Sequence, residues 1–316
     1  MTSPVQDSST PAAVPSTPAA PLVSIVMPTF NRAHLVRQAI DAVLAQTYSN
    51  WELILVNDGS RDNTRAVIDG YAACDPRIRC IHKDNEGIPD TVNRGWREAK
   101  GEYLTWTSDD NLYFPAAIER MLRFLETHAD IAFVFTDSEY IDGEGRSMGV
   151  REAGPPEMLE DYCPLAGCLL FRRAVLATVD PFRRQWRRCH DFDFYHRVYQ
   201  HFKLARIPEV LYYYRCHAAS MSGNQQALVT DHYRCLCSYP ENAGRKRHLW
   251  ARAWKELAKW EEKHGPCWRA VPYHVRAALY EPQHWPAAWG CLWKTVYIRL
   301  VPPSLKALWR RLRGRS

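Results

Sequence analysis

The stretch "LTWTSDDNLYFP", residues 104–115, joins a short apolar segment to two adjacent carboxylates. Leu104 to Thr107 favour a β-strand, and Asp109 and Asp110 follow almost directly. Because like charges repel, a positive partner is needed to hold both groups ionised. Adjacent carboxylates at a strand end suit a hard divalent cation such as Mg²⁺ or Mn²⁺. Taken alone, the pair is more typical of a turn with two solvated aspartates.

Segments that favour strands and helices alternate on both sides of this stretch. Short apolar runs predict strands at residues 22–29, 51–58, 77–84, 101–107 and 131–137. Helical patterns fill the intervals at residues 33–46, 63–73, 90–99 and 115–128. This alternation predicts an α/β fold with parallel strands and crossover helices. After residue 137 the pattern is mixed, with a hairpin at 137–149, a strand and helix within 163–179, a helix at 191–202 and a strand at 210–217.

Composition limits the class of protein. The chain has 316 residues, of which 46% are apolar, so a large core can form. The net charge of +6 is concentrated at the end, where seven basic residues and no acidic one follow from Lys294. A nucleic-acid binder would also carry basic residues on its folded body, so nucleic acid is not an expected partner. The ten cysteines form no CxxC pair, which argues against zinc and for free thiols.

We predict four parts along the chain. Residues 1–21 contain five prolines and one charge, which favours disorder over a signal peptide. Residues 22–222 are predicted to form the main domain, with halves at 22–136 and 137–222. Residues 223–284 are predicted to be a helical extension. No run of 18 apolar residues predicts a membrane span. The basic, Trp-rich tail at 285–316 favours an amphipathic helix on an anionic membrane surface, with packing on the protein's own body as the alternative.

Polar residues gather where the predicted strands end. "MPTFNR" (27–32) supplies Thr29 and Asn31, "VNDGS" (56–60) supplies Asp58, and the opening stretch supplies its two aspartates. Parallel α/β sheets bind nucleotides at the carboxyl ends of their strands. A fourth segment, "NEGIPDTVNRG" (85–95), adds a loop and a helix start. Each segment also has an ordinary structural explanation, since Asp58 is suited to cap a helix and Arg94 to lie on the surface.

In this order and spacing, the four segments resemble the nucleotide-sugar half of the inverting family 2 glycosyltransferases. The resemblance covers more than 100 residues and implies a GT-A fold, Rossmann-like, with a mixed central sheet and a mostly helical C-terminal extension. It implies that Thr29 and Asp58 contact the base of a UDP- or dTDP-sugar, that Asp109 approaches the ribose or sugar, and that Asp110, helped by Asp109, holds Mn²⁺ or Mg²⁺. The full set of expected nucleotide-sugar contacts is Pro28, Thr29, Asn31, Arg32, Asp58, Asn85, Gly87, Asn93, Arg94, Asp109, Arg215 and His217.

The second half carries the expected acceptor chemistry. "RCHDFDFYHRV" (188–198) resembles the family's acidic motif at a helix start, which implies that Asp191 is the general base and Asp193 the runner-up. An N-cap aspartate is the structural alternative. "YYYRCHAASMS" (212–222) resembles the strand and loop that follow, so Arg215, His217 and Ser222 are expected near the diphosphate. For His217, a core or surface position is nearly as well supported.

The sequence thus predicts a metal-dependent inverting glycosyltransferase of hexosyltransferase type. The expected acceptor is a glycan or lipid-linked hydroxyl, in cell-surface polysaccharide biosynthesis at the cytoplasmic face of the membrane. The family often has acids where this chain has Asn57, Thr107 and His190. These departures leave a catalytically silent nucleotide-sugar-binding or scaffold protein as an alternative. A sugar nucleotidyltransferase is a second alternative, although "MPTFNR" lacks the glycine-rich, lysine-bearing loop that such enzymes favour.

Overall fold

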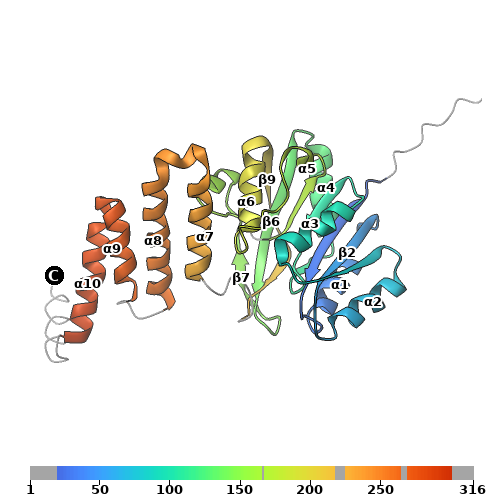
Figure 1. The fold of residues 1–316 in the computed structure, drawn as a ribbon, viewed down its shortest axis with the longest axis horizontal. Coiled ribbons are helices and arrows are strands. Elements are labelled where there is room, and N and C mark those ends of the chain that lie inside the picture. Colours follow the sequence, from blue (N-terminus) through green and yellow to red (C-terminus); the bar gives the residue numbers. More distant parts are fainter. Residues whose placement is uncertain (1–19, 166, 218–224, 265–268, 301–316) are drawn as a thin grey trace, which may run out of the picture.

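The computed structural model describes residues 20–165, 167–217, 225–264 and 269–300. A body built around a β-sheet forms one end of an elongated molecule, and helices α7 to α10 extend from it (Figure 1). Nearly all of the predicted disordered segment 1–21 lies outside the described residues. The end of the predicted tail, residues 301–316, also lies outside them.

One nine-stranded mixed sheet organises the body, in the order β3-β2-β1-β4-β8-β6-β9-β5, with β7 paired to β6. Strands β3, β2, β1 and β4 are mutually parallel, as are β6 and β9, whereas β8 is antiparallel to both β4 and β6. The strands are β1 (Val23–Thr29), β2 (Trp51–Asp58), β3 (Ile78–Lys83), β4 (Tyr103–Trp106), β5 (Leu112–Tyr113), β6 (Ile131–Ile141), β7 (Ser147–Arg151), β8 (Leu169–Arg172) and β9 (Lys203–Arg215).

Helices connect the strands and then continue as the extension. Those of the body are α1 (Val36–Leu44), α2 (Thr64–Cys74), α3 (Ile88–Glu98), α4 (Ala117–Thr127), α5 (Val175–Thr178) and α6 (His190–His201), with a 3₁₀ turn η1 (Pro156–Glu160). Those of the extension are α7 (Gln225–Ser238), η3 (Pro240–Arg245), α8 (Lys246–His264), α9 (Val271–Tyr280), η5 (Pro282–His284) and α10 (Trp285–Leu300).

Both faces of the sheet are buried, which explains why β1 and β2 are mostly apolar. Alternate residues enter two separate cores: Val26 and Ile54 pack with α3 and α6, while Ile25 and Leu53 pack with α1, α2 and α4. Gly95 of α3 lies so close to β1 that an added Cβ would be 2.3 Å from Val26 Cγ1. Helix α3 and the loop before it are therefore held firmly against the sheet.

The predicted mixed α/β fold is confirmed; most differences lie at element boundaries, and the two-residue strand β5 was not predicted. Helix α1 begins at Val36 rather than at residue 33. The turn before it is held to the loop after β2, where the backbone N–H groups of Arg32 and Ala33 donate to Thr64 Oγ1 and Asp62. Strand β9 begins at Lys203, earlier than predicted, because it pairs with the whole of β6. Among the helices of the described ranges, none combines the length and apolar character that crossing a bilayer requires.

Candidate active site

The turn after β1 and the loop after β2 are locked together. Asn31 has a φ of 52°, a left-handed conformation that asparagine tolerates. Its backbone N–H donates to Ser60 Oγ at 2.9 Å, and its Oδ1 accepts from the Arg61 backbone N–H at 2.8 Å. Two of the predicted segments, "MPTFNR" and "VNDGS", therefore form one surface at the carboxyl edge of the sheet.

Asp58 lies at the end of β2 and is only 4% exposed. Its carboxylate accepts from the backbone N–H groups of Glu86 at 3.0 Å and Gly87 at 2.9 Å, and it is paired with Lys83 Nζ. Burial opposes ionisation, but the hydrogen bonds outweigh it and lower the pKa of Asp58. The carboxylate is therefore held charged and oriented, and it does not cap α2.

The "NEG" loop is fixed against the same site. Asn85 Nδ2 donates to the Asp58 backbone carbonyl at 2.9 Å. Gly59 has a φ of +76°, and a Cβ there would be 2.9 Å from Asn85 N, so a glycine is needed for this close approach. Gly87, at a φ of +92°, begins α3. Asn85 and Gly87 thus shape the Asp58 site, and their predicted contact with a nucleotide sugar stays a prediction.

Asp109 and Asp110 follow β4 at the same edge and have two positively charged or basic neighbours. Arg32 Nε lies 4.0 Å from Asp109 Oδ1, and His217 Nε2 lies 3.0 Å from Asp110 Oδ2. Burial, and then the charge of Asp110, raise the pKa of Asp109 to about 7, against the lowering effects of Thr29, Arg32 and the Phe30 N–H. Neighbouring side chains therefore compensate the two carboxylates only in part.

These residues fit a divalent cation by their chemistry. Two carboxylates supply the oxygen donors that Mn²⁺ and Mg²⁺ prefer, and the His217 imidazole, 3.0 Å from Asp110, is a further, less preferred nitrogen donor. Burial and then the charge of Asp110 raise the pKa of Asp109, and a bound cation would favour the ionised form of this carboxyl. Thr107, where the family often has an acid, is 2% exposed, and its hydroxyl is 2.7 Å from the Tyr212 hydroxyl. Thr107 therefore packs in the body and leaves the donor set to the other three residues.

Arg215 is brought to the site but is turned towards the protein's own backbone. Its Nε donates to the Asp110 carbonyl at 3.0 Å, Nη1 to the Gly143 carbonyl at 3.1 Å and Nη2 to Gln38 Oε1 at 2.8 Å. The backbone N–H of Arg215 donates to Asn111 Oδ1 at 2.8 Å. These contacts hold the aspartate loop in place from the end of β9.

Asn93 and Arg94 lie on α3 and also have structural partners. Asn93 exchanges two hydrogen bonds with the backbone of Phe182, at 2.7 and 3.0 Å. Arg94 is paired with Glu98 at 3.1 Å on an exposed face. The structure therefore brings Pro28, Thr29, Asn31, Arg32, Asp58, Asn85, Gly87, Asp109, Asp110, Arg215 and His217 to one sheet edge, and gives Asn93 and Arg94 contacts elsewhere.

Asp191 and Asp193 both lie in the first turn of α6, in opposite environments. Asp193 is fully buried and accepts from Arg197 Nε at 3.0 Å and Nη2 at 2.8 Å. It also accepts from the Tyr239 hydroxyl at 2.6 Å. Asp191 is partly exposed and accepts from the Phe192 backbone N–H at 2.8 Å. Only Asp191 has the solvent access that an acceptor hydroxyl requires.

The start of α6 lies beside the end of β4. The Trp106 ring centroid is 5.8 Å from that of His190, and Trp106 Nε1 donates to the Tyr195 hydroxyl at 3.3 Å. His190, which stands where the family often has Glu, is buried between Trp106 and Phe182, and burial lowers its pKa. These contacts of Trp106 place the start of α6, which carries Asp191, next to β4. The same strand leads into Asp109 and Asp110.

Several residues of the site were not predicted from the sequence. Lys83 pairs with Asp58, Asn111 holds β9, and Ser60 and Asp62 fix the first turn. Lys83 is the last residue of β3, and the register of β2 and β3 pairs it with Asp58. Knowledge of this strand order would have revealed the Lys83–Asp58 pair. The other three are polar loop residues whose partners lie far away in the sequence.

Comparison with known proteins agrees with this geometry. Residues 24–203, more than half of the chain, match the family model described as "Glycosyl transferase family 2". An uncharacterized glycosyltransferase of Rickettsia prowazekii is 32% identical over 211 residues, covering 63% of this chain and 65% of its own. One from Rickettsia typhi is 32% identical over 204 residues, covering 61% of each chain. The chain thus spans less than two thirds of these relatives' length.

Solved structures share the fold at low sequence identity. S. aureus TarS 1-349 in complex with UDP has a TM-score of 0.59 at 13% identity, covering 84% of this chain and 82% of TarS 1-349. The mannosyltransferase PcManGT of Pyrobaculum calidifontis, in complex with GDP-Man and Mn²⁺, has a TM-score of 0.56 at 17% identity, covering 89% and 88%. The fold is therefore that of the GT-A glycosyltransferases, and the chain belongs to glycosyl transferase family 2.

Proposed function

We propose that the protein is an inverting glycosyltransferase that uses a divalent metal ion and a UDP- or dTDP-sugar. The observation that carries the proposal is the meeting of Asp58, Asp109, Asp110 and His217 at one sheet edge, with the start of α6 beside it. Family membership supports the same reaction class. The contents of two neighbours, UDP-GlcNAc in TarS and GDP-Man in PcManGT, support a nucleotide-sugar donor.

Asp58 is suited to recognise a pyrimidine base. Lys83, Glu86 and Gly87 hold the carboxylate ionised and oriented, and Thr91 also approaches it. We propose that this carboxylate accepts the imide N–H of uracil or thymine, a donor that cytosine lacks at this ring position. We therefore propose a uridine or thymidine donor, with Thr29, Asn31 and the Asn85 loop forming the walls of the base site.

Asp109, Asp110 and His217 would hold Mn²⁺ or Mg²⁺. When bound, the ion stabilises the negative charge that develops on the leaving diphosphate. Arg32, 4.0 Å from Asp109, adds a fixed positive charge at the same place. Arg215 acts by holding the Asp110 backbone, so we assign it a positioning role in place of the direct diphosphate contact.

Asp191 is the proposed general base. As the acceptor oxygen forms a bond to the anomeric carbon, the bond from that carbon to the diphosphate oxygen breaks on the opposite face. The hydroxyl proton passes to the Asp191 carboxylate. One such displacement inverts the anomeric centre and needs no covalent intermediate. Asp193 cannot share this role, because Arg197 and Tyr239 occupy its oxygens.

We further propose that the acceptor is a glycan or lipid-linked molecule at the cytoplasmic membrane surface, as in cell-surface polysaccharide synthesis. In this division of the chain, residues 22–222 act on sugars and the helices after residue 223 lead to a membrane-binding tail at 285–316. Trp285, Trp289 and Leu292 of α10 expose 37%, 63% and 37% of their surface, and the basic residues begin directly after them at Lys294. Apolar surface beside basic charge is typical of an interfacial helix.

The membrane proposal is tested by vesicle co-sedimentation. Each basic side chain near an anionic surface contributes about 1 kcal/mol. Replacing Arg310, Arg311 and Arg313 with Gln should weaken binding to phosphatidylserine vesicles roughly 100-fold, since 1.4 kcal/mol is about tenfold. Binding to neutral phosphatidylcholine vesicles is the control. Equal binding of wild type and variant to anionic vesicles would overturn the proposal.

The enzymatic proposal is tested by UDP and dTDP release from a panel of nucleotide sugars, with Mn²⁺ or Mg²⁺. We expect slow hydrolysis or transfer that chelation abolishes and that Asp191→Asn lowers about 10²- to 10⁴-fold, the usual value of a general base. Asp130→Asn, at an exposed pair with Lys203, is the matched control. Donor binding without turnover on a broad acceptor panel would favour the silent alternative, and pyrophosphate-dependent synthesis of the donor would favour the nucleotidyltransferase.

A further inference from the structure

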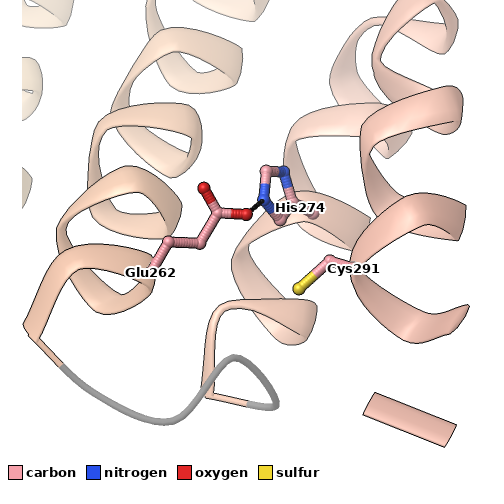
Figure 2. Close-up of side chains that lie close together, drawn as sticks. All are labelled: Glu262, His274 and Cys291. Carbon is pink, nitrogen blue, oxygen red and sulfur yellow. Dashed lines mark hydrogen bonds and ion pairs between the residues drawn. The ribbon is translucent and has the colours of Figure 1, made fainter. Parts of the chain in front are cut away.

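A second cluster of ligand-type side chains lies in the helical extension, outside the sugar-transfer site. Glu262 of α8, His274 of α9 and Cys291 of α10 point towards one another from three different helices (Figure 2). His274 Nε2 is 2.9 Å from Glu262 Oε1. One oxygen, one nitrogen and one sulfur atom of the three residues all lie within 4.8 Å of one another.

Burial distinguishes this cluster from a surface ion pair. His274 is 7% exposed and Cys291 is 3% exposed, whereas the Glu262 side chain is 42% exposed. The site therefore has two buried ligands at its base and one carboxylate at its rim. A metal ion can enter from the Glu262 side, and a water molecule can complete the coordination there.

The donor types select among metal ions. Thiolate sulfur, imidazole nitrogen and carboxylate oxygen together suit Zn²⁺, whereas Mg²⁺ and Ca²⁺ prefer oxygen alone. Zinc bonds of about 2.0 to 2.3 Å at tetrahedral angles place ligand atoms about 3.5 Å apart. Separations of at most 4.8 Å therefore require a closure of about 1 Å, and it falls on the Cys291 sulfur, because His274 Nε2 and Glu262 Oε1 are already 2.9 Å apart.

Among the described residues, the core immediately around Cys291 is small. The cluster that packs around Cys291 contains Ala258 and Ala270, with Val271 and Tyr273 partly buried. Alanine side chains bury little apolar area, so they provide little of the free energy that orders helices. Small units with poor cores are commonly stabilised by a structural metal.

We infer that Glu262, His274 and Cys291 form a Zn²⁺ site that ties α8, α9 and α10 together. On binding, the Cys291 thiol loses its proton to solvent as the Zn–S bond forms, and the proton of His274 moves to Nδ1 so that Nε2 binds the ion. The Glu262 carboxylate exchanges its contact with His274 for a contact with the metal. Sequence spacing argued against zinc because no CxxC pair exists, but here each ligand comes from a different helix.

The test uses the full-length protein, stripped with a chelator and titrated with Co²⁺ and then Zn²⁺. Co²⁺ bound by a thiolate gives a charge-transfer absorption band, which the oxygen and imidazole ligands of the sugar-transfer site cannot produce. We expect this band at one equivalent per chain, its loss on adding Zn²⁺, and a higher unfolding temperature with Zn²⁺. Cys291→Ser should abolish the band, and Cys74→Ser, at an exposed thiol on α2, should keep it.

His274→Gln provides a second, independent variant, and circular dichroism verifies that both variants fold. It should also abolish the band, because a two-ligand site does not hold cobalt at one equivalent. Absence of the band in the wild type, or a band that Cys291→Ser leaves unchanged, would overturn the inference. Sugar-transfer activity is not part of the readout, so the outcome is separate from that of the proposed function.

Discussion

The two aspartates in the first turn of α6 should respond in opposite ways to the same substitution. Asp193→Asn keeps the volume but removes a fully buried charge that pairs with Arg197 and accepts from Tyr239. Removing one partner of a buried ion pair costs about 3 to 5 kcal/mol. We expect the lower end, about 3 kcal/mol, because Arg197 also donates to the carbonyls of Asp180 and Pro181.

For domains of 150 to 250 residues, 1 kcal/mol shifts the unfolding temperature by about 2 to 4 °C. Asp193→Asn should therefore lower it by about 6 to 12 °C. Asp191→Asn should change it by less than about 3 °C, since the group is partly exposed and an amide oxygen can still accept from the Phe192 N–H. Turnover should show the reverse order, with a 10²- to 10⁴-fold loss only in Asp191→Asn.

Two assays measure the effects on stability and on catalysis separately. Circular dichroism follows thermal unfolding, and donor turnover is measured at a temperature well below both unfolding transitions. The wild type and Asp130→Asn define the unperturbed values. If folded Asp193→Asn loses turnover while Asp191→Asn keeps it, the assignment of the base is wrong. If Asp193→Asn unfolds at the wild-type temperature, the buried ion pair does not contribute as its contacts indicate.

Three other substitutions test single contacts. Asp110→Asn should abolish stimulation by Mn²⁺, measured by metal titration of donor turnover; unchanged stimulation would exclude Asp110 as a ligand. Gly95→Ala places a Cβ 2.3 Å from Val26 Cγ1 and should cost about 1 to 3 kcal/mol in urea unfolding; a neutral effect would mean that α3 can move away from β1. Arg215→Met removes a buried guanidinium that holds Asp110, Gly143 and Gln38. It should raise the Mn²⁺ concentration needed for half-maximal turnover, and an unchanged value with normal folding would contradict its positioning role.

The strand ends were predictable because local chemistry specifies them. Apolar β-branched runs followed by polar residues located Thr29, Asp58 and the two aspartates on the chain, and the alternation with helices required parallel neighbours. The pairing of Lys83 with Asp58 was not predictable in the same way. It depends on β3 lying next to β2 in one register, which is a property of the assembled sheet.

Side chains that satisfy the protein's own backbone were the least predictable. Asn93 and Arg215 have residue types that suit phosphate binding, and a sequence cannot tell whether a phosphate or a distant carbonyl is the partner. Their hydrogen bonds reach residues 89 and 105 positions away. Similarly, Asp191 and Asp193 are neighbouring acids on one helix start, and contacts distant in sequence, from Cys235 of α7 and from Tyr239 just after it, distinguish the buried Asp193.

The contacts of β9 also explain why the site cannot be divided at residue 136. Asn111 accepts from the backbone of Arg215, Arg215 holds the Asp110 carbonyl, and His217 meets the Asp110 carboxylate. Because β5 pairs with β9, the aspartate loop is held by a strand that the chain reaches only after α6. Hydrogen-bond partners of the aspartate loop are therefore supplied in part by the second half of the domain. We therefore expect the proposed metal site to form only when residues 137–222 have folded, so loss of β9 should remove metal binding even if every residue of the first half is present.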